Sequence, residues 1–384
     1  MGGIRVVAAP NAFRGSLDAA GAAAAMASGL RAARPGTLVL ELPLADGGDG
    51  TAAVLLAARG GQWRSLRVPD AWGQPRHAPW VLLDDGSAVV EISAASGLGR
   101  RRPTPAQALR ASSYGTGLLI AEALRQGARR VLLALGGSAC SDGGGGLLAA
   151  LGARLLDGAG QPPPLGGQGL AELARLDLSR LDLGGVPWTV LVDVQSPLLG
   201  PNGAAARFGP QKGAGAEEVR LLEAGLRRWA TLLEEATGRR GARELPGAGA
   251  AGGSGFALAA LGADIRSGAE VVAETVGLDA ALEQADILLT GEGRLDAQTA
   301  QGKAPWLAAS RASACGVPAV ALAGSLGPGW EGLLAPQGPL EAALVLGTGP
   351  RGARQAMAET ARDLEIAAGQ ALRLCLARPG RPGT

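Results

Sequence analysis

Short apolar segments recur along the chain, and each is followed by glycine and small polar or acidic residues and then by a stretch of helical composition. Seven segments show this pattern: 4–9, 38–43, 131–135, 190–194, 287–290, 319–323 and 342–346. Apolar runs of this length, bounded by turn residues, are typical of buried strands. The intervening stretches 17–34, 116–126 and 216–237 are rich in Ala, Leu and Arg and are expected to be helices. Strands that alternate with helices predict an α/β fold with a mainly parallel sheet.

One region departs from this alternation. The shorter strand-like pieces 65–68, 79–83 and 88–92 are joined by turns such as Asp84-Asp85-Gly86. They predict an antiparallel insertion and so a second domain or subdomain. A further strand is expected at 154–156, surface loops at 158–169 and 239–249, and a frayed tail beyond Arg378. The length of 384 residues also favours two domains.

Composition excludes several classes of site and partner. The single histidine, His77, rules out two-histidine metal sites, and its neighbours predict a solvated loop residue. Three cysteines without a C-x-x-C indicate a reducing compartment. The net charge of +2 favours neither nucleic acid nor an anionic membrane as a partner. The apolar stretch 19–30 is too short to cross a bilayer, and the first residues do not resemble a signal peptide, so we expect a cytoplasmic protein.

The residues that follow the expected strands are the ones to inspect, because ligands of open α/β sheets bind outside the carboxyl ends of the strands. Five of the seven segments lead into glycine with an acidic or basic residue close by: P-N-A-F-R-G-S (10–16), A-D-G-G-D-G-T (45–51), G-G-S-A-C-S-D-G-G-G-G (136–146), D-V-Q-S-P-L-L-G-P-N-G (193–203) and T-G-E-G-R-L-D-A-Q-T (290–299). Glycine lets backbone N–H groups approach an anion, and adjacent carboxylates suit Mg²⁺. Together these parts predict phosphoryl transfer.

Two residue types are rare enough to single out their positions. Of the 36 basic residues only Lys212 and Lys303 are lysines, in G-P-Q-K-G and Q-G-K-A-P. We expect a functional reason, because arginine does not always replace a compact ammonium group. The only asparagines, Asn11 and Asn202, lie in turn-like strings, which ordinary turn preference also explains.

Two familiar phosphate-binding motifs do not account for these loops. The chain contains no G-x-x-x-x-G-K-[ST] string. Residues 247–252 match G-x-G-x-x-G by letter, but R-R-G-A-R-E-L-P precedes them instead of a strand. A dinucleotide-binding turn requires that strand, so we expect a glycine-rich loop that enters a helix.

The motifs, taken in order, resemble those of the bacterial glycerate kinase family, the type I D-glycerate kinases. The likeness covers residues 4–326 and includes seven strings: P-N-A-F-R-G-S, A-D-G-G-D-G-T, S-S-Y-G-T-G, L-G-G-S-A-C-S-D-G-G-G-G, G-P-N-G-A-A-A-R-F-G-P-Q-K-G-A, T-G-E-G-R-L-D-A-Q-T and G-K-A-P. The resemblance implies ATP-dependent phosphorylation of D-glycerate with Mg²⁺. It also implies a Rossmann-like sheet domain and a second, smaller mixed α/β domain, with the active site in the cleft between them.

The domain boundaries and site roles are expectations that follow from this resemblance and from the motifs. We expect a core domain of residues 1–66 and 285–384 and a second domain of residues 67–284. Asp193 is expected to be the catalytic base, Asp46 and Asp296 to lie on the metal side, and Lys303 to neutralise the phosphoryl oxygens. The remaining expected site residues are Arg14, Ser16, Asn11 and Asn202 for the substrate, and Gly136, Gly137, Ser138, Asp142, Gly143, Lys212 and Glu292 for ATP, with Glu292 able to exchange roles with Asp296.

Departures from the family pattern leave alternatives open. The first loop of the family usually reads P-D-S-F-K-G-S, so Asn11, Ala12 and Arg14 differ, and Gln195 and Ser196 replace an acid and an amide. Ser141 likewise stands where asparagine is usual. These changes are compatible with a former kinase that only binds its ligands, or with a kinase for another small hydroxy acid. The string L-G-G-S-A-C-S is also similar to the phosphate loop of homoserine and mevalonate kinases, a reading that leaves Asp46, Asp193 and Asp296 unexplained. Phosphorylation at position 2 or 3 and a homodimer both remain open.

Overall fold

The computed structural model describes residues 3–377. Contacts within the chain divide it into two compact units. Unit 1 comprises Met1–Asp46 and Ala269–Thr384, and unit 2 is the continuous segment Gly47–Gly268. The boundary that we expected after residue 66 falls inside a long hairpin strand. The boundary that we expected after residue 284 lies beyond two helices that belong to unit 1.

Unit 1 is built on a five-stranded parallel sheet in the order β13-β12-β11-β1-β2. Its strands are β1 (Arg5–Pro10), β2 (Leu38–Glu41), β11 (Ile287–Glu292), β12 (Ala319–Ala323) and β13 (Ala342–Val345). Its helices are α1 (Ala19–Ala33), α10 (Gly268–Val276), α11 (Leu278–Leu282), α12 (Ala304–Ala314), α13 (Ala353–Ala358) and α14 (Thr360–Leu376). In chain order within the unit, this sheet has the 2-1-3-4-5 order of flavodoxin-like doubly wound folds.

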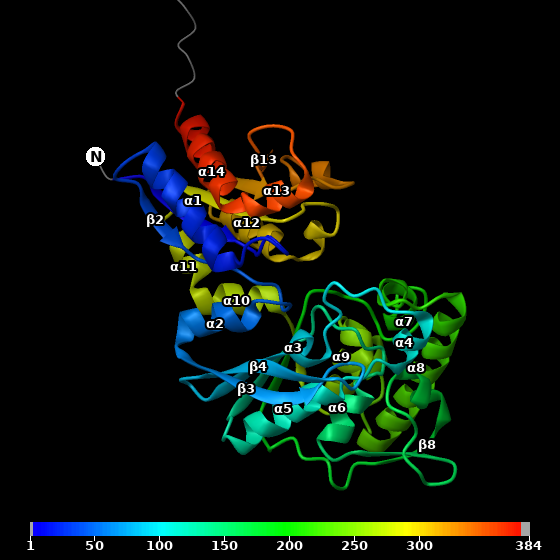
Figure 1. Cartoon of the computed structure of the whole chain (residues 1–384). Coiled ribbons are helices and arrows are strands. Elements are labelled where there is room, and N and C mark those ends of the chain that lie inside the picture. Colours follow the sequence, from blue (N-terminus) through cyan, green and yellow to red (C-terminus); the bar gives the residue numbers. More distant parts are fainter. Residues whose placement is uncertain (1–2, 378–384) are drawn as a thin grey trace, which may run out of the picture. The chain divides into compact units, whose positions relative to one another are not determined.

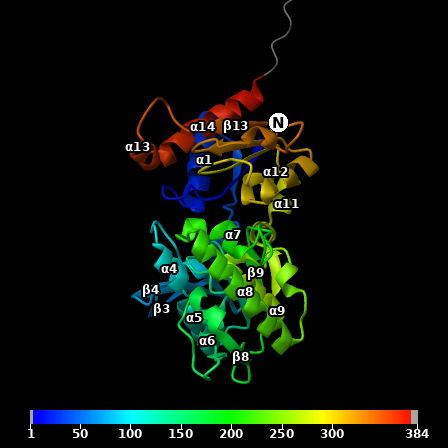
Figure 2. The same ribbon diagram turned by 90° about the vertical axis from the view of Figure 1, so that its right-hand side faces the viewer.

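Helices cover both faces of the unit 1 sheet. The helices α1 and α14 lie side by side and share one apolar cluster with β1, β11 and β12 (Figure 1; Figure 2). Their close approach needs glycine, since a Cβ at Gly29 of α1 would collide with the backbone oxygen of Glu365. Helix α12 contacts β1, β11 and β12 without joining that cluster, so it covers the opposite face.

Unit 2 contains a mixed six-stranded sheet in the order β10-β9-β6-β5-β4-β3. Its strands are β3 (Gly61–Pro69), β4 (Pro75–Leu83), β5 (Ser87–Glu91), β6 (Arg130–Ala134), β9 (Trp188–Val192) and β10 (Asp264–Ser267), with a separate hairpin of β7 (Arg154–Asp157) and β8 (Leu173–Asp177). Its helices are α2 (Thr51–Arg59), α3 (Ile92–Ser96), α4 (Pro105–Arg110), α5 (Tyr114–Arg125), α6 (Gly145–Ala150), α7 (Ala204–Phe208), α8 (Ala216–Thr237) and α9 (Ala250–Ala260). Figure 2 shows α5 and α6 next to each other, where they contribute to the main core of the unit.

The α/β prediction is confirmed, and each of the seven expected strands exists. The antiparallel pieces, however, do not form a subdomain of their own. Strand β5 pairs with β4 on one side and, in parallel, with β6 on the other, so the hairpin extends the main sheet of unit 2. His77 is exposed, as predicted, but it lies within β4 opposite Arg67 and not in a loop.

Several smaller features differ from expectation. Strands β8 and β10 were not expected, and the two expected surface loops contain short 3₁₀ turns at Gly167–Glu172 and Ala242–Glu244. The tail beyond Arg378 lies outside the described residues. Between residues 3 and 377, no helix combines the length and apolar character needed to cross a membrane.

Candidate active site

The strand order of unit 1 predicts a position for a ligand site. In a 2-1-3-4-5 sheet the strand order reverses between the first and third strands, which remain parallel. The crevice at the carboxyl ends of these two strands is the usual ligand site. Here those strands are β1 and β11. They lead into the strings 10–16 and 290–299, which the sequence had singled out, while β2 leads toward Asp46. The parallel sheet therefore gathers three of the five expected strings at one edge.

Asn11 links two of these strand ends. Its backbone N–H donates to the Gly291 carbonyl at 2.8 Å, and its side-chain Nδ2 donates to Asp46 Oδ2 at 3.1 Å. Burial raises the pKa of Asp46, while Lys303, the hydrogen bond from Asn11 and the charge of Arg14 oppose that shift. Asn11 thus supplies a neutral donor to a carboxylate that is costly to ionise.

Glu292 is a second perturbed carboxyl of this edge. Its side chain is 10% exposed, Thr299 Oγ1 donates to its Oε1 at 2.9 Å, and Lys303 Nζ lies 3.9 Å from its Oε2. Burial raises its pKa to about 7, with further contributions from Asp46 and Asp296, against the opposing effect of Lys303 and Thr299. A carboxyl that titrates near neutral pH is suited to proton transfer and is typical of functional sites.

Lys303 occupies a position that local helix energetics disfavour. It is the N-cap residue of α12, where the helix dipole favours negative groups and where Ser, Thr, Asp or Asn usually cap. Such a conflict with local preference is typical of functional positions. Its ammonium group is the main attraction that lowers the pKa values of both Asp46 and Glu292.

The other expected residues of unit 1 are held in turns. Asp296 Oδ1 accepts from Gln298 N at 2.9 Å, and its Oδ2 lies 3.3 Å from Arg294 Nε. Ser16 is exposed, and its hydroxyl donates to the Phe13 carbonyl at 2.9 Å, which leaves its oxygen free to accept. Arg14 is exposed in the same turn. Thr299 was missed by sequence reasoning, although it belongs to a quoted motif, because its role depends on its contact with Glu292.

The raised pKa of Glu292 predicts a pH-dependent stability. Between its ordinary pKa of 4.5 and about 7, the folded protein keeps a proton that the unfolded chain has released. The free energy of unfolding therefore falls as pH rises through this window, by about 3 kcal/mol at about 1.4 kcal/mol per pH unit. Glu292→Gln should remove this part of the slope and be more stable than the wild type at pH 8. Urea unfolding at three pH values measures it, with Glu341→Gln, an exposed carboxyl of unit 1, as control; identical slopes for Glu292→Gln and wild type would contradict the assignment.

The glycine-rich segment 136–146 of unit 2 follows β6 and offers unpaired donors. No described residue accepts a hydrogen bond from the backbone N–H groups of Gly137 or Ser138. By contrast, Gly136 N donates to the Gly47 carbonyl at 3.0 Å, and Gly143 N donates to the Gly252 carbonyl at 2.9 Å. Backbone donors seldom remain unpaired in native structures unless water or a ligand reaches them. Gly137 and Ser138 therefore carry the N–H groups of this loop that remain available to a ligand, whereas the N–H groups of Gly136 and Gly143 are bonded within the protein.

Asp142 holds the glycine-rich loop together from within. It is 1% exposed, and its Oδ2 accepts from Ser113 N at 2.8 Å, Ser113 Oγ at 2.9 Å, Ser112 Oγ at 3.2 Å and Gly146 N at 3.2 Å. Its Oδ1 accepts from Gly144 N at 3.2 Å. These bonds tie the starts of α5 and α6 together. We therefore assign to Asp142 a role in loop shape in place of the nucleotide contact that we expected.

Lys212 is also buried in this region. Its side chain, 3% exposed, donates from Nζ to the Cys140 carbonyl at 2.6 Å and to Ser138 Oγ at 3.2 Å. Burial lowers its pKa. Lys212 thus lies beside the expected phosphate loop, but its contacts are with the loop itself.

Asp193 lies at the same edge of the unit 2 sheet as the glycine-rich loop. It directly follows β9, which pairs in parallel with β6 on one side and β10 on the other, and it is partly exposed. Asn202 is exposed in the turn before α7.

Asp49 was missed by sequence reasoning. Its carboxylate oxygen lies 3.3 Å from where a Cβ at Gly137 would stand, and its signal was the second acid of A-D-G-G-D-G-T.

Gly136 is required by the backbone packed against it. A Cβ there would lie 2.5 Å from Gly48 Cα and 3.2 Å from the Gly47 carbonyl oxygen, and backbone atoms cannot rotate away. Gly136→Ala should lower the free energy of unfolding by about 1–3 kcal/mol and raise the KM for ATP, because the loop must shift. Gly158→Ala is the matched control, since a Cβ at Gly158 meets nothing within 4 Å. Equal unfolding midpoints and KM values for the two variants would refute the close approach.

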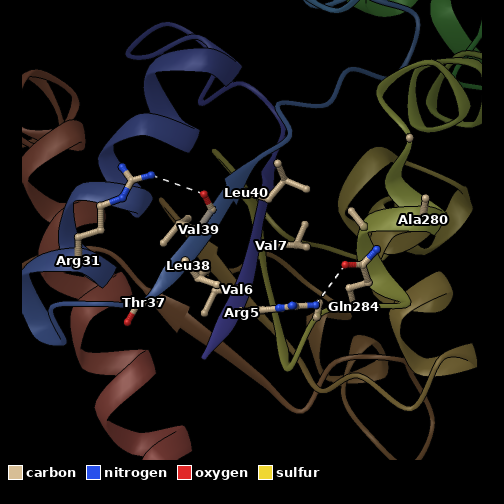
Figure 3. A pocket seen from close by; sticks show the side chains of 13 residues that line it. Arg5, Val6, Val7, Arg31, Thr37, Leu38, Val39, Leu40, Ala280 and Gln284 are labelled. Atoms are coloured by element: carbon tan, nitrogen blue, oxygen red, sulfur yellow. Dashed lines mark hydrogen bonds between the residues drawn. The ribbon is translucent and has the colours of Figure 1, made fainter. Parts of the chain in front are cut away.

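Two cavities do not coincide with the strand ends of β1 and β11, although Asp142, Gly145 and Gly146 of the glycine-rich segment line the second one. One of about 700 Å³ lies in unit 1 between β1, β2 and α11 (Figure 3). Leu38 and Leu40, each about half exposed, line it, and Arg5 donates to Gln284 Oε1 at 3.1 Å there. It opens at the amino-terminal half of β1, away from Asn11. A second cavity of about 460 Å³ lies in unit 2 between α6 and the loop 160–166. Asp46, Asp193 and Lys303 line neither cavity, so the candidate site rests on the strand ends.

Comparison with known proteins decides the family. The profile of the glycerate kinase family matches residues 6–376. The chain belongs to the glycerate kinase family. It is therefore a kinase, and the resemblance drawn from its motifs is confirmed. It is 41% identical to a glycerate kinase of Bacillus subtilis (strain 168) over 327 residues, which cover 84% of this chain and 85% of the relative.

Two further glycerate kinase relatives match with similar coverage. A glycerate 2-kinase of Escherichia coli (strain K12) is 39% identical over 84% of this chain and 86% of its own length. A crystal structure assigned to glycerate kinase 2 of Salmonella typhimurium LT2 is 37% identical, with a TM-score of 0.82 over 97% of this chain and 98% of that one. The fold and the family thus agree along nearly the whole chain.

Proposed function

We propose that this glycerate kinase family member transfers the γ-phosphoryl group of ATP to a hydroxyl of D-glycerate. The observation that carries the proposal is the edge at β1 and β11. There the sheet brings together the perturbed carboxyls Asp46 and Glu292 and the cation Lys303. Phosphoryl transfer needs such a combination, because the protein acts mainly by positioning and by balancing charge.

The ATP phosphates are proposed to bind the glycine-rich loop of unit 2. The supporting observation is the unpaired N–H groups of Gly137 and Ser138, which together form a site for an anion. Asp142 and the glycines Gly136 and Gly143 keep this segment in shape. Lys303 would neutralise the phosphoryl oxygens as charge develops in the transition state.

The acceptor is proposed to bind at the β1 edge of unit 1. Arg14 would hold the glycerate carboxylate through its planar fork, and the Ser16 oxygen would accept from a substrate hydroxyl. Asp193 is the proposed base: it takes the hydroxyl proton as the oxygen bonds to the γ-phosphorus and the bond to ADP breaks. Asn11 and Asn202 are further proposed substrate-binding residues.

Mg²⁺ is the proposed metal, and its donors must be carboxylates. Among residues 3–377, no three His, Cys, Asp or Glu side chains converge into a ready metal site. Mg²⁺ does not need one, because it commonly takes one or two carboxylates together with phosphate oxygens. Asp46 fits this role. Asp296 is the other proposed ligand, and Glu292 could exchange roles with it, since each of these carboxylates already has one contact at each oxygen. When bound, the metal would offset charge on the phosphate oxygens.

We further propose 2-phosphoglycerate as the product, on the strength of the glycerate 2-kinase relative. The test is incubation with ATP, Mg²⁺ and D-glycerate, followed by phosphorus NMR of the product. A single new resonance assigned to 2-phosphoglycerate, with stoichiometric ADP, is the expected result. Formation of 3-phosphoglycerate would overturn the position only. Binding of ATP and glycerate without turnover would overturn the activity and favour a former kinase, and turnover of another hydroxy acid alone would overturn the substrate.

A further inference from the structure

Lys212 carries a buried positive charge that no carboxylate of the described chain contacts directly, although the charge of Asp142 attracts it through space. Its side chain is 3% exposed, and within residues 3–377 it forms no ion pair. Buried charges are ordinarily paired, because leaving water is costly. The 2.6 Å separation between Lys212 Nζ and the Cys140 carbonyl is short, as in charge-assisted hydrogen bonds, so we treat the group as an ammonium. Because Asp142 does not contact the ammonium group, an anion that binds from outside can add to this balance.

The ammonium group determines whether the Ser138 hydroxyl donates or accepts in the hydrogen bond between them. A hydroxyl has one hydrogen to donate and an oxygen that accepts, whereas an ammonium group only donates. Ser138 Oγ, 3.2 Å from Lys212 Nζ, must therefore accept. Its own hydrogen remains available, and no residue in the described part of the chain accepts it. The N–H groups of Gly137 and Ser138 likewise lack acceptors, so one short segment presents three donors.

We propose that Lys212 is a positioning residue of the nucleotide site: by holding the Ser138 oxygen as an acceptor, it leaves the Ser138 hydroxyl hydrogen for a phosphate oxygen. The inference rests on the proposed function, in which ATP phosphates bind this loop. It replaces the direct phosphate contact that the sequence predicted for Lys212. Lys212 acts through Ser138 and through its charge beneath the loop.

This role explains why lysine stands here in a chain that otherwise uses arginine. An ammonium group has three donors, and two of them meet the Cys140 carbonyl and Ser138 Oγ. A guanidinium group would bring five donors in a rigid plane to the same buried space, and most of them would lack acceptors. Lys212→Arg should therefore weaken ADP binding, whereas Ser138→Thr, which keeps the hydroxyl, should bind ADP like the wild type.

The test is a double-mutant cycle of wild type, S138A, K212M and S138A/K212M. The affinities for ADP and for adenosine are measured by equilibrium binding, and the KM for ATP by initial rates. S138A should weaken ADP binding about tenfold or more, the effect of losing one hydrogen bond to a charged group, and leave adenosine binding unchanged. K212M should do the same, and the double variant should be no worse than the weaker single variant. Arg220→Met, which removes an exposed cation of α8, is the control and should bind like wild type.

The outcomes separate this inference from the proposed function. Multiplied effects in the double variant, or wild-type ADP affinity in K212M, would overturn the positioning role. Wild-type ADP affinity in S138A would overturn it as well, because the hydroxyl would then not meet a phosphate. If K212M does not fold, as judged by urea unfolding, K212Q takes its place in the same cycle. Failure of the wild type to phosphorylate D-glycerate would count against the proposed function alone, since ADP binding is still measured.

Discussion

Replacement of Asp193 by asparagine should lower kcat by about 100-fold or more, the usual cost of losing a general base. Asparagine preserves the size of the side chain but cannot take the proton of the acceptor hydroxyl. Asp193 is partly exposed at the carboxyl end of β9, so the exchange leaves the core of unit 2 intact. Initial rates at saturating ATP and D-glycerate measure the effect, and the KM for ATP should change little.

Asp264→Asn provides the matched control for this prediction. Asp264 is an exposed aspartate on β10, the strand that pairs in parallel with β9, but it lies at the amino end, opposite Thr189. Its replacement should therefore leave kcat unchanged. Wild-type turnover of Asp193→Asn, with unaltered unfolding, would remove Asp193 from the mechanism.

Replacement of Lys303 by methionine should also reduce kcat by about 100-fold or more, because a preorganised charge near the transferred group is lost. A second effect follows from the same contact. Lys303 is the main attraction that lowers the pKa values of Asp46 and Glu292, so both should rise further in the variant. On the acidic side of the pH–rate profile, the pH at which activity reaches half of its maximum should therefore move upward. A pH–rate profile between pH 5 and 9 tests both effects together.

Arg311→Met is the corresponding control on the same helix. Arg311 lies in the last turn of α12 and pairs with the largely exposed Asp279 at 2.8 Å. Exposed pairs of this kind contribute about 1 kcal/mol or less, so the variant should fold and keep its kcat. Equal kcat values in Lys303→Met and Arg311→Met would exclude Lys303 from phosphoryl transfer.

The inner parallel strands could be predicted from the sequence because they are buried on both faces and therefore form apolar runs that end near glycine. Strands β8 and β10 carry no such signal, since L-A-R-L-D is short and interrupted by an arginine, and D-I-R-S is short and mostly polar. The parallel pairing of β5 with β6 also left no local trace, because it joins residues far apart in the chain. The position of the hairpin was therefore beyond sequence reasoning.

The candidate site shows a similar division. Its location at strand ends followed from general rules for α/β sheets, and the strings 10–16 and 290–299 do lie at the switch point of unit 1. Whether each polar side chain is available to a ligand or bonds to the protein itself could not be predicted from the sequence. Asp142 and Lys212 have the residue types of ligand-binding groups, yet their partners are loop atoms. Only tertiary contacts separate a residue that contacts a ligand from one that holds the loop.

The discontinuity of unit 1 has a consequence for biosynthesis. Strand β11 lies between β1 and β12 in the sheet, so β1 and β2 cannot complete their core until the ribosome has made the chain beyond residue 292. Unit 2 is continuous, and its two ends meet, since a Cβ at Gly47 would lie 3.2 Å from Gly268 Cα. Domains generally fold as they emerge. The nascent chain should therefore fold unit 2 first. Until β11 is made, β1 and β2 remain an incomplete sheet that is accessible to chaperones.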